Sequence, residues 1–321
     1  MINQVNLIDG RFAPINSLGQ GGFGRVYLVQ DMLKGGVAAL KFLTGDSQDA
    51  FVRFQREARL LEAARANPHV VQVLHHNMAH TPPYIVTEYC EGGSLRSWVG
   101  SGNPWQNIAG VLTHVVVGLA SLHAVGGFHR DLKPDNLLVT RDPQNPNWLR
   151  IKLADFGLAR VPARHASPMT HGYGGTPGYI APEVQRGSPY QPSADIYSVG
   201  VIAAELLTGE QSDRLLDSVS IPEQLRKLVR AMLAPVPTLR PTAQVIAAML
   251  NALLRASSNP EPPANGATQQ QAAAVSQDSG IGAGKLLFGG LIAGGILFAL
   301  AALAGGEGEG GDGGGKPKVG P

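Results

Sequence analysis

Cysteine is nearly absent from this sequence, because Cys90 is the single one among 321 residues. One cysteine cannot form an internal disulfide, so the chain is not a disulfide-stabilised secreted domain, and it suits a reducing compartment. The 26 basic and 24 acidic residues leave a net charge of only +2, which is too small to indicate binding to nucleic acid. The nine histidines lack the spacing to cysteines or carboxylates that metal sites need. Met1–Gln4 has neither positive charge nor an apolar run, so we expect no signal peptide.

Two short motifs in the middle of the chain indicate one kind of chemistry. His129–Asn136 has the sequence HRDLKPDN, and Asp155–Gly157 has the sequence DFG. Together they place a candidate proton acceptor, a candidate phosphate-binding lysine and two candidate oxygen ligands for magnesium on neighbouring loops, as phosphoryl transfer requires. The DFG tripeptide alone would be equally consistent with a turn around a buried phenylalanine. The two motifs in this order, with room for a strand–turn–strand between them, rarely arise by chance.

A glycine-rich stretch and a lysine extend the pattern towards the N-terminus. Leu18–Val26 fits G-x-G-x-x-G-x-V between two β-like segments, and glycines there would let the backbone approach phosphates closely. Alone, the pattern would equally indicate a dinucleotide-binding fold or a plain hairpin. Val37–Lys41 is an apolar strand that ends in a lysine, and a buried lysine requires an anionic partner. We expect Glu57 to be that partner, on an amphipathic helix that starts near Asp49, with a solvated Glu57 as the alternative.

In this combination the residues resemble the eukaryotic-type protein kinase family, in its serine/threonine branch. The resemblance covers residues 11–255 approximately. Gly175–Glu183 resembles the end of the family's activation segment, Asp195 its buried helical aspartate, and Arg240 the arginine that pairs with Glu183. The resemblance implies an α+β, two-lobed protein kinase fold. Its small β-rich N-lobe with one helix would occupy about 11–90, and its larger, mostly helical C-lobe about 91–255.

The hydrophobic pattern agrees with this division of the chain. Ile108–Ala124 is apolar on nearly every face and is therefore predicted to be a buried helix. Leu137–Leu153 is predicted to be a hairpin around a turn-rich centre. Three helices are expected to start near residues 193, 222 and 242. His129 is expected to pack inside, under Phe156.

The resemblance also implies the roles of individual residues. Asp131 would accept the proton of the substrate hydroxyl, and Lys133 would steady the moving γ-phosphoryl group. Lys41, fixed by Glu57, would bind the α- and β-phosphates of ATP. Asn136 and Asp155 would hold Mg²⁺, with Mn²⁺ as a substitute, because these cations take oxygen ligands. The implied nucleotide-binding positions are Leu18, Gly19, Gly21, Gly24, Val26, Ala39, Lys41, Glu88, Cys90, Asn136, Leu138 and Asp155.

Part of this set would bind the adenine. Val26, Ala39 and Leu138 would lie on its two faces, and the backbone of the hinge, Thr87–Gly93, would read its edge. Thr87 would be the small residue at the rear of the adenine site. Cys90 lies within this hinge, so we expect it to be structural rather than reactive.

The expected substrates are proteins with serine or threonine. Lys133 and Thr176 stand where they do in serine/threonine kinases, but no peptide preference can be read from the chain. Two alternatives stay open at this point. One is a catalytically silent, kinase-shaped binding module, which the complete set of motifs disfavours. The other is a phosphotransferase for small molecules, which Ala181–Glu183, the end of a peptide-binding platform, disfavours.

Three arginines suggest regulation by phosphorylation. Arg53, Arg130 and Arg160 match positions where the family gathers positive charge around an activation-loop phosphate. A phosphate of about −1.5 to −2 charge would relieve their mutual repulsion and order the loop. Thr170 is the first candidate for autophosphorylation and Ser167 the second. The alternative is that these arginines are simply solvated.

The sequence changes its character after residue 255. Residues 256–284 contain too few large apolar side chains to fold and are expected to form a flexible linker. Residues 286–304 contain no charged or polar side chain, and as a helix they would span roughly 28 Å, enough for a membrane. Burial in a further domain is the alternative. We expect a single-pass membrane protein with a cytoplasmic kinase domain and a glycine-rich, disordered tail at 305–321. Gly290–Gly294 fits G-x-x-x-G and predicts a homodimer through the membrane helix.

Overall fold

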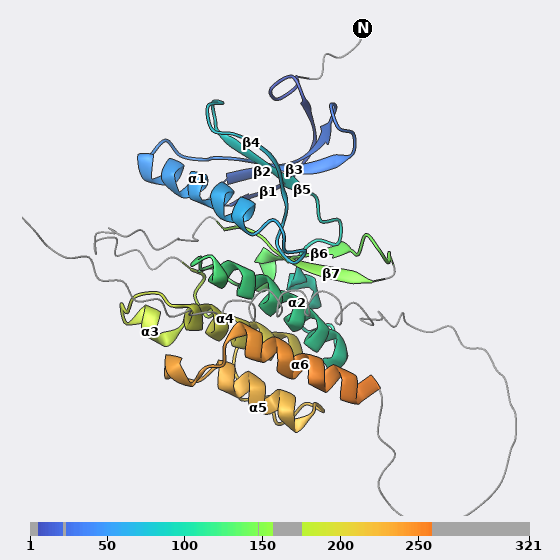
Figure 1. The fold of residues 1–321 in the computed structure, drawn as a ribbon, viewed down its shortest axis with the longest axis vertical. Coiled ribbons are helices and arrows are strands. Elements are labelled where there is room, and N and C mark those ends of the chain that lie inside the picture. Colours follow the sequence, from blue (N-terminus) through green and yellow to red (C-terminus); the bar gives the residue numbers. More distant parts are fainter. Residues whose placement is uncertain (1–5, 22–23, 147, 157–174, 259–321) are drawn as a thin grey trace, which may run out of the picture. The chain divides into compact units, whose positions relative to one another are not determined.

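The computed structural model of the chain describes residues 6–21, 24–146, 148–156 and 175–258 (Figure 1). Some predicted features lie outside these ranges: Gly157, Arg160, the candidate phosphosites Ser167 and Thr170, and the membrane segment 286–304 with its tail. The last described helix, α6, ends at Ser258, so all but the first three residues of the predicted linker lie outside as well.

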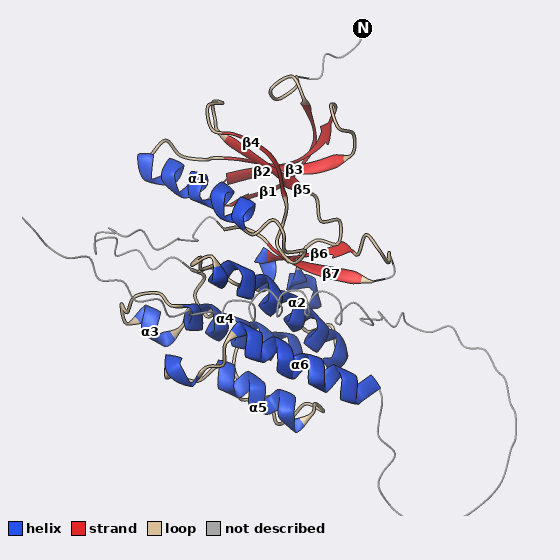
Figure 2. Cartoon of the chain, in the orientation of Figure 1, coloured by secondary structure: helices blue, strands red, loops and turns tan. Residues whose placement is uncertain are grey.

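The N-terminal part is an antiparallel five-stranded sheet with one helix beside it (Figure 2). The strand order is β1-β2-β3-β5-β4. On β3 the buried residues Ala38 and Leu40 alternate with more exposed ones, because successive side chains of a strand point to opposite faces. They form a core with Phe12, Val29 and Tyr84, which have no exposed surface. The strands are Phe12–Gly21 (β1), Gly24–Asp31 (β2), Val37–Phe42 (β3), Val73–Asn77 (β4) and Tyr84–Glu88 (β5).

Helix α1 (Gln48–Ala63) carries Glu57 to the sheet. The helix begins after Ser47, whose side chain accepts the backbone N–H of Ala50 and so caps the first turn. Phe54 and Ala58 are buried and pack against Ile85 of β5. Glu57 lies on the same side, only 3% exposed, because residues three and four positions apart share one face of a helix.

The remainder of the described chain is mostly helical. Its central helix, α2 (Trp105–Ala124), packs against α4, α6 and β7. Within the described ranges, α2 is the one helix long and apolar enough to cross a membrane, but 61% of that stretch is buried inside the protein, as predicted for a core helix. The other helices are α3 (Pro182–Gln185), α4 (Pro192–Thr208), α5 (Glu223–Met232) and α6 (Ala243–Ser258), with 3₁₀ turns at Leu95–Trp98 (η1), Pro134–Asn136 (η2) and Pro237–Leu239 (η3). The predicted two-lobed α+β fold is confirmed.

The predicted hairpin is formed by β6 (Leu137–Arg141) and β7 (Leu149–Leu153). It is bound to the segment between α1 and β4, because the N–H of Val71 donates to the carbonyl of Leu153 (3.0 Å) and the N–H of Leu153 to the carbonyl of His69 (2.9 Å). The hairpin therefore connects the sheet with the loop that carries Asp155.

Three buried charged groups hold the helical part together, as the sequence predicts. Asp195 has no exposed surface and accepts the backbone N–H groups of His129 and Arg130, both at 3.0 Å. It thereby fixes the chain just before Asp131. The side chain of Arg240, itself fully buried, donates twice to Glu183, at 2.6 and 2.8 Å. Removing one partner of such a buried pair costs about 3–5 kcal/mol, because a charge is left without compensation.

Candidate active site

Lys41 of β3 is the centre of one cluster of charges. Its ammonium nitrogen, Nζ, lies 2.8 Å from Glu57 Oε1 and 2.8 Å from Asp155 Oδ1. The pairing with Glu57 is confirmed, and the contact with Asp155 joins the two parts of the chain. Burial alone would lower the pKa of Lys41, but the two carboxylates outweigh it and the pKa lies above its usual value. Burial also raises the pKa of Glu57, although Lys41 favours its charged form.

Gly24 lets the glycine-rich strands approach this lysine. A Cβ atom at Gly24 would lie 2.5 Å from the carbonyl oxygen of Phe42 and 3.0 Å from Cγ of Lys41. Any other residue would push β2 away from β3, so the close packing of the two strands requires glycine. Leu18, Gly19 and Gly21 lie on β1, and Gly19 is the register partner of Val26 on β2. Their role as a cradle for phosphates stays a prediction, because Gly22 and Phe23, which join the two strands, lie outside the described residues.

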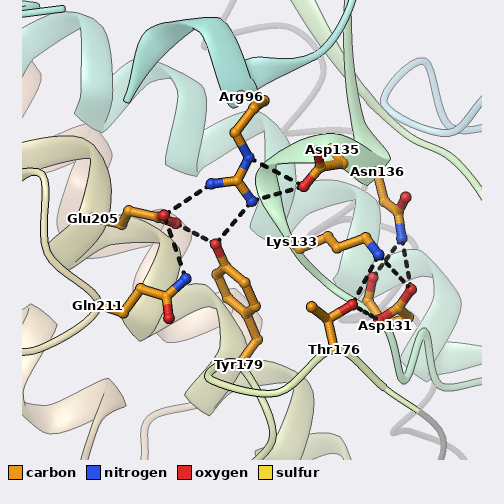
Figure 3. Close-up of polar contacts among 9 residues, drawn as sticks. All are labelled: Arg96, Asp131, Lys133, Asp135, Asn136, Thr176, Tyr179, Glu205 and Gln211. Atoms are coloured by element: carbon orange, nitrogen blue, oxygen red, sulfur yellow. Dashed lines mark hydrogen bonds and ion pairs between the residues drawn. The ribbon is translucent and has the colours of Figure 1, made fainter. Parts of the chain in front are cut away.

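Asp131 is the centre of a second cluster, drawn in Figure 3. The hydroxyl of Thr176 donates to Asp131 Oδ1 (2.8 Å), and Lys133 Nζ donates to that same hydroxyl (2.8 Å). Lys133 Nζ also lies 3.3 Å from Asp131 Oδ2. The amide nitrogen of Asn136 donates to the carbonyl of Asp131 (2.7 Å) and to its Oδ2 (3.1 Å). The carboxylate is therefore held in one orientation by three side chains, while 7% of the residue is exposed.

The donor set around Asn136 fits a divalent cation. Its amide nitrogen makes both contacts with Asp131, so the amide oxygen points to the other side of the group. The N–H of Ala154 donates to the carbonyl of Asn136 (2.9 Å), which holds Asn136 beside the residue that precedes Asp155. One amide oxygen and one carboxylate are the oxygen ligands that Mg²⁺ takes. The described residues contain no group of three or more His, Cys, Asp or Glu that could hold a metal, so phosphate oxygens and water would have to complete the coordination.

Two residues beside these clusters have unusual backbone conformations. Arg130 and Asp155 have φ angles of 72° and 59°, in the left-handed region. Such conformations cost on the order of 1–3 kcal/mol in residues other than glycine and persist only where neighbours hold them. The bonds from Asp195 to Arg130 and from Lys41 to Asp155 supply that restraint. His129, which precedes Arg130, is fully buried, with its ring centroid 4.9 Å from that of Phe156, as predicted.

The predicted adenine-binding residues come from both sheets: Val26 and Ala39 lie on the neighbouring strands β2 and β3, and Leu138 lies on β6 of the hairpin. Ala39 of β3 is the register partner of Thr87 on β5, and Leu138 of β6 forms a bridge with Ser94 just after the hinge. Burial raises the pKa of the Cys90 thiol to about 12, helped by the nearby charge of Glu88, so this cysteine is a poor nucleophile. Its predicted structural role is consistent with this pKa and with its 6% exposure.

Sequence reasoning assigned Glu88 only through its backbone and missed its side chain. Its Oε1 accepts from Lys152 Nζ (2.7 Å) and from the backbone N–H of Gln72 (2.8 Å). No local signal marks this pair, because Lys152 alternates with Arg150 in the strand Leu149–Leu153, a pattern typical of a solvated face.

A polar network beside Asp131 was also missed (Figure 3). Arg96, in the turn η1, donates to Asp135 Oδ2 (2.7 Å), to Glu205 Oε1 (2.8 Å) and to the hydroxyl of Tyr179 (3.0 Å). Tyr179 donates in turn to the second oxygen of Glu205. The network therefore ties the end of the predicted activation segment to α4 and to the loop that contains Asp131.

The predicted phosphate-binding arginines lie partly outside the described residues. Arg53 is exposed on α1. The guanidinium of Arg130 lies over the ring of Tyr190, 5.0 Å from its centroid. Arg160 and the acceptors Thr170 and Ser167 are not among the described residues, so their convergence stays a prediction.

A comparison with protein families decides how these clusters are interpreted. The family model described as protein kinase domain matches residues 12–250. The chain belongs to the protein kinase family. The match covers every described residue of the site, from Leu18 to Thr176, and lies inside the predicted range 11–255. Lys41, Asp131, Asn136 and Asp155 therefore belong to a kinase domain.

Several bacterial proteins named as kinases resemble this kinase domain. Serine/threonine-protein kinase Pkn1 of Myxococcus xanthus is 34% identical over 259 residues, which are 78% of this chain and 36% of Pkn1. Pkn2 of the same organism is 35% identical over 210 residues, 63% of this chain and 25% of its own. PknL of Mycobacterium tuberculosis is 36% identical over 209 residues, 63% of this chain and 50% of PknL. The domain is thus that of a protein serine/threonine kinase, and the chain spans at most about half the length of these relatives.

Proposed function

We propose that the chain is a serine/threonine protein kinase that transfers the γ-phosphate of ATP to hydroxyl groups of proteins. The observation that carries this proposal is the position of the Asp131 carboxylate, which Thr176, Lys133 and Asn136 hold in one orientation. The Lys41 cluster supplies a second set of groups, suited to phosphates and a divalent cation.

Each residue of the two clusters has a role in the proposed reaction. Asp131 orients the substrate hydroxyl and accepts its proton as the oxygen forms a bond to the γ-phosphorus and the bond to the β-phosphate oxygen breaks. Lys133 is close enough to Asp131 to balance negative charge at the same place. Lys41 binds phosphate oxygens, with Glu57 fixing its position. Mg²⁺, when bound by Asn136 and Asp155, neutralises charge on the phosphates.

The test is ATP turnover by the full chain with labelled ATP and a mixture of protein substrates. We expect Asp131→Asn to lower the rate by about 10³-fold, because the amide keeps the shape of the carboxylate but cannot take the proton. Asp46→Asn changes an exposed aspartate and is the matched control. A wild-type rate equal to that of Asp131→Asn would contradict the proposal and favour the silent binding module.

A protein substrate is favoured over a small molecule by the network around Tyr179. The segment Gly175–Glu183 is held by Arg96, Glu205 and the Glu183–Arg240 pair, which suits a firm platform for a polypeptide. Phosphorylation of an aminoglycoside or choline at a rate above that of the protein mixture would overturn this choice.

We also propose that the kinase phosphorylates its own activation loop, at Thr170 first and Ser167 second. The exposure of Arg53 supports this, because an exposed guanidinium is open to a phosphate. Intact mass and peptide mapping after incubation with ATP would identify the sites. Unchanged activity in the double variant Thr170→Ala/Ser167→Ala would count against the proposal.

The last part of the proposal concerns location, and it rests on composition. Residues 286–304 would anchor the chain as a single membrane helix, with the kinase domain in the cytoplasm where ATP is available. Leu297→Arg should move the full chain from the membrane to the soluble fraction, and no change would contradict the anchor. Dimerisation through Gly290 and Gly294 predicts that Gly290→Leu/Gly294→Leu abolishes density-dependent autophosphorylation.

A further inference from the structure

Lys152 is a buried lysine that the catalytic clusters do not use. It lies on β7, and its side chain is only 5% exposed. Its Nζ is 2.7 Å from Oε1 of Glu88, the last residue of β5. A buried ammonium group requires such a partner, and the partner here is the first acidic residue of the predicted hinge, Thr87–Gly93.

Glu88 is held on a second side by the backbone of Gln72. The N–H of Gln72 donates to Oε1 of Glu88 (2.8 Å), and the N–H of Glu88 donates to the carbonyl of Gln72 (3.0 Å). One carboxylate oxygen therefore accepts from both Gln72 and Lys152. This arrangement fixes the side chain of Glu88 and, with it, the backbone position at which the hinge begins.

The remainder of the hinge is bound to the same hairpin that carries Lys152. The carboxylate of Glu91 accepts from the hydroxyl of Thr140 (2.8 Å) and from the N–H of Arg141 (3.0 Å). Gly92 donates to the carbonyl of Val139 (2.9 Å), and a Cβ at Gly92 would lie 2.8 Å from that oxygen, so the contact requires glycine. The hinge thus rests on β6 at its end and on β7, through Lys152, at its beginning.

The register of the hairpin connects Lys152 with the nucleotide site. Lys152 is the register partner of Leu138, the residue predicted to lie against the adenine. A shift of the hinge relative to the hairpin would therefore change the distance between the groups that read the edge of the base and the side chain that covers its face. The Lys152–Glu88 pair is the ionic contact that opposes such a shift where β5 ends.

We propose that Lys152 is a positioning residue for nucleotide binding: paired with Glu88, it sets the place of the hinge against the β6–β7 hairpin and thereby the affinity and purine selectivity of the site. The inference rests on the proposed function, because it requires that ATP binds between the hinge and Leu138. Lys152 does not touch the nucleotide in this proposal and acts through Glu88.

The experiment measures binding and turnover with the full chain. Calorimetry would give the affinities for Mg·ATP, for adenosine and for Mg·tripolyphosphate, and a turnover assay would give the ratio of kcat/KM for ATP and GTP. We expect Lys152→Met to weaken adenosine binding by about tenfold, the effect of losing one charge-assisted hydrogen bond. Tripolyphosphate should bind as in the wild type, because Lys41 and Gly24 are unchanged. The preference for ATP over GTP should fall.

Three further variants separate positioning from simple loss of stability. Lys152→Arg keeps the charge and should retain most of the adenosine affinity. Lys152→Met/Glu88→Gln leaves no charge without a partner, so it should fold better than Lys152→Met while still showing the reduced ATP preference. Lys227→Met, which changes a lysine whose side chain is 74% exposed, is the matched control and should behave as the wild type. If Lys152→Met does not fold, adenosine affinity and ATP preference are measured on the double variant instead.

The possible failures can be told apart. A folded Lys152→Met or double variant with unchanged adenosine affinity and unchanged ATP preference would show that Lys152 serves stability alone, and it would overturn the inference while the kinase activity stands. Equal weakening of adenosine and tripolyphosphate would overturn it too, because the disturbance would then be general. If the wild type binds no Mg·ATP, both the proposed function and the inference fall.

Discussion

The two ends of the proposed nucleotide site are each built around an ion-paired lysine, and the charges of the two lysines are balanced differently. At the phosphate end, Lys41 faces two carboxylates, Glu57 and Asp155, so this cluster carries a net negative charge. At the adenine end, Lys152 faces Glu88, and the two charges cancel. An excess of negative charge suits a place where a metal cation enters, whereas a balanced pair suits a place where the protein only supports its own backbone. The comparison predicts that the same substitution has different consequences at the two ends.

The largest expected effect comes from removing the lysine of the phosphate end. Lys41→Met should lower kcat/KM for ATP by about 10³-fold, or about 4 kcal/mol, because the phosphates lose a cation. Lys34→Met changes an exposed lysine and should leave the rate unchanged. Turnover with labelled ATP measures kcat/KM for each variant. If Lys41→Met and Lys152→Met reduced turnover equally, the distinction between the two ends would be lost.

A smaller effect is expected from Glu57, which positions Lys41 rather than contacting phosphate. Glu57→Gln should lower kcat/KM by about 10²-fold, since Lys41 keeps Asp155 as a partner but loses its fixed position. Glu62→Gln on the same helix, with a side chain 49% exposed, is the control. A loss as large as that of Lys41→Met would mean that Asp155 alone cannot hold the lysine.

The last prediction concerns stability and two stacked histidines beside Ile151 of β7. The rings of His69 and His114 lie 4.2 Å apart, and His69 donates to the carbonyl of Ile151, next to Lys152. Burial lowers the pKa of His69 to about 4 from an ordinary value of 6.5, so the unfolded chain takes up the proton first as the pH falls. The stability that His69 contributes is therefore complete above pH 6.5 and is lost between pH 6.5 and 4.

His69→Asn should reduce this loss. Over that pH range the free energy of unfolding should fall by about 3 kcal/mol less in His69→Asn than in the wild type, because asparagine can donate to Ile151 without titrating. Urea unfolding at a series of pH values measures this free energy of unfolding. At pH 7.5 the two proteins should differ little, and identical slopes at low pH would show that His69 does not titrate in this range.

The two lysines show which contacts of the site can be predicted from the sequence. Lys41 and Glu57 were predicted as a pair because the helix and strand that carry them are close in sequence and belong to a recognisable series of motifs. Lys152 and Glu88 are 64 residues apart, and Arg96 and Glu205 are 109 residues apart. Nothing local distinguishes these residues from charges on a surface, so only the packing of the hairpin and of α4 brings each pair together. Motif residues, buried helices and the pair Glu183–Arg240, which belongs to the motifs, were predictable, and the supporting contacts outside the motifs were not.

The hydroxyl of Thr176 has a consequence for how the enzyme would be switched on. It is hydrogen-bonded to Asp131 and to Lys133 at once, although it belongs to a separate stretch of chain. If residues 175–179 moved away, Asp131 Oδ1 would lose the hydroxyl that holds it, and only Lys133 and Asn136 would be left to orient the carboxylate. The order of this segment and the orientation of the proton acceptor are therefore coupled through the side chain of Thr176.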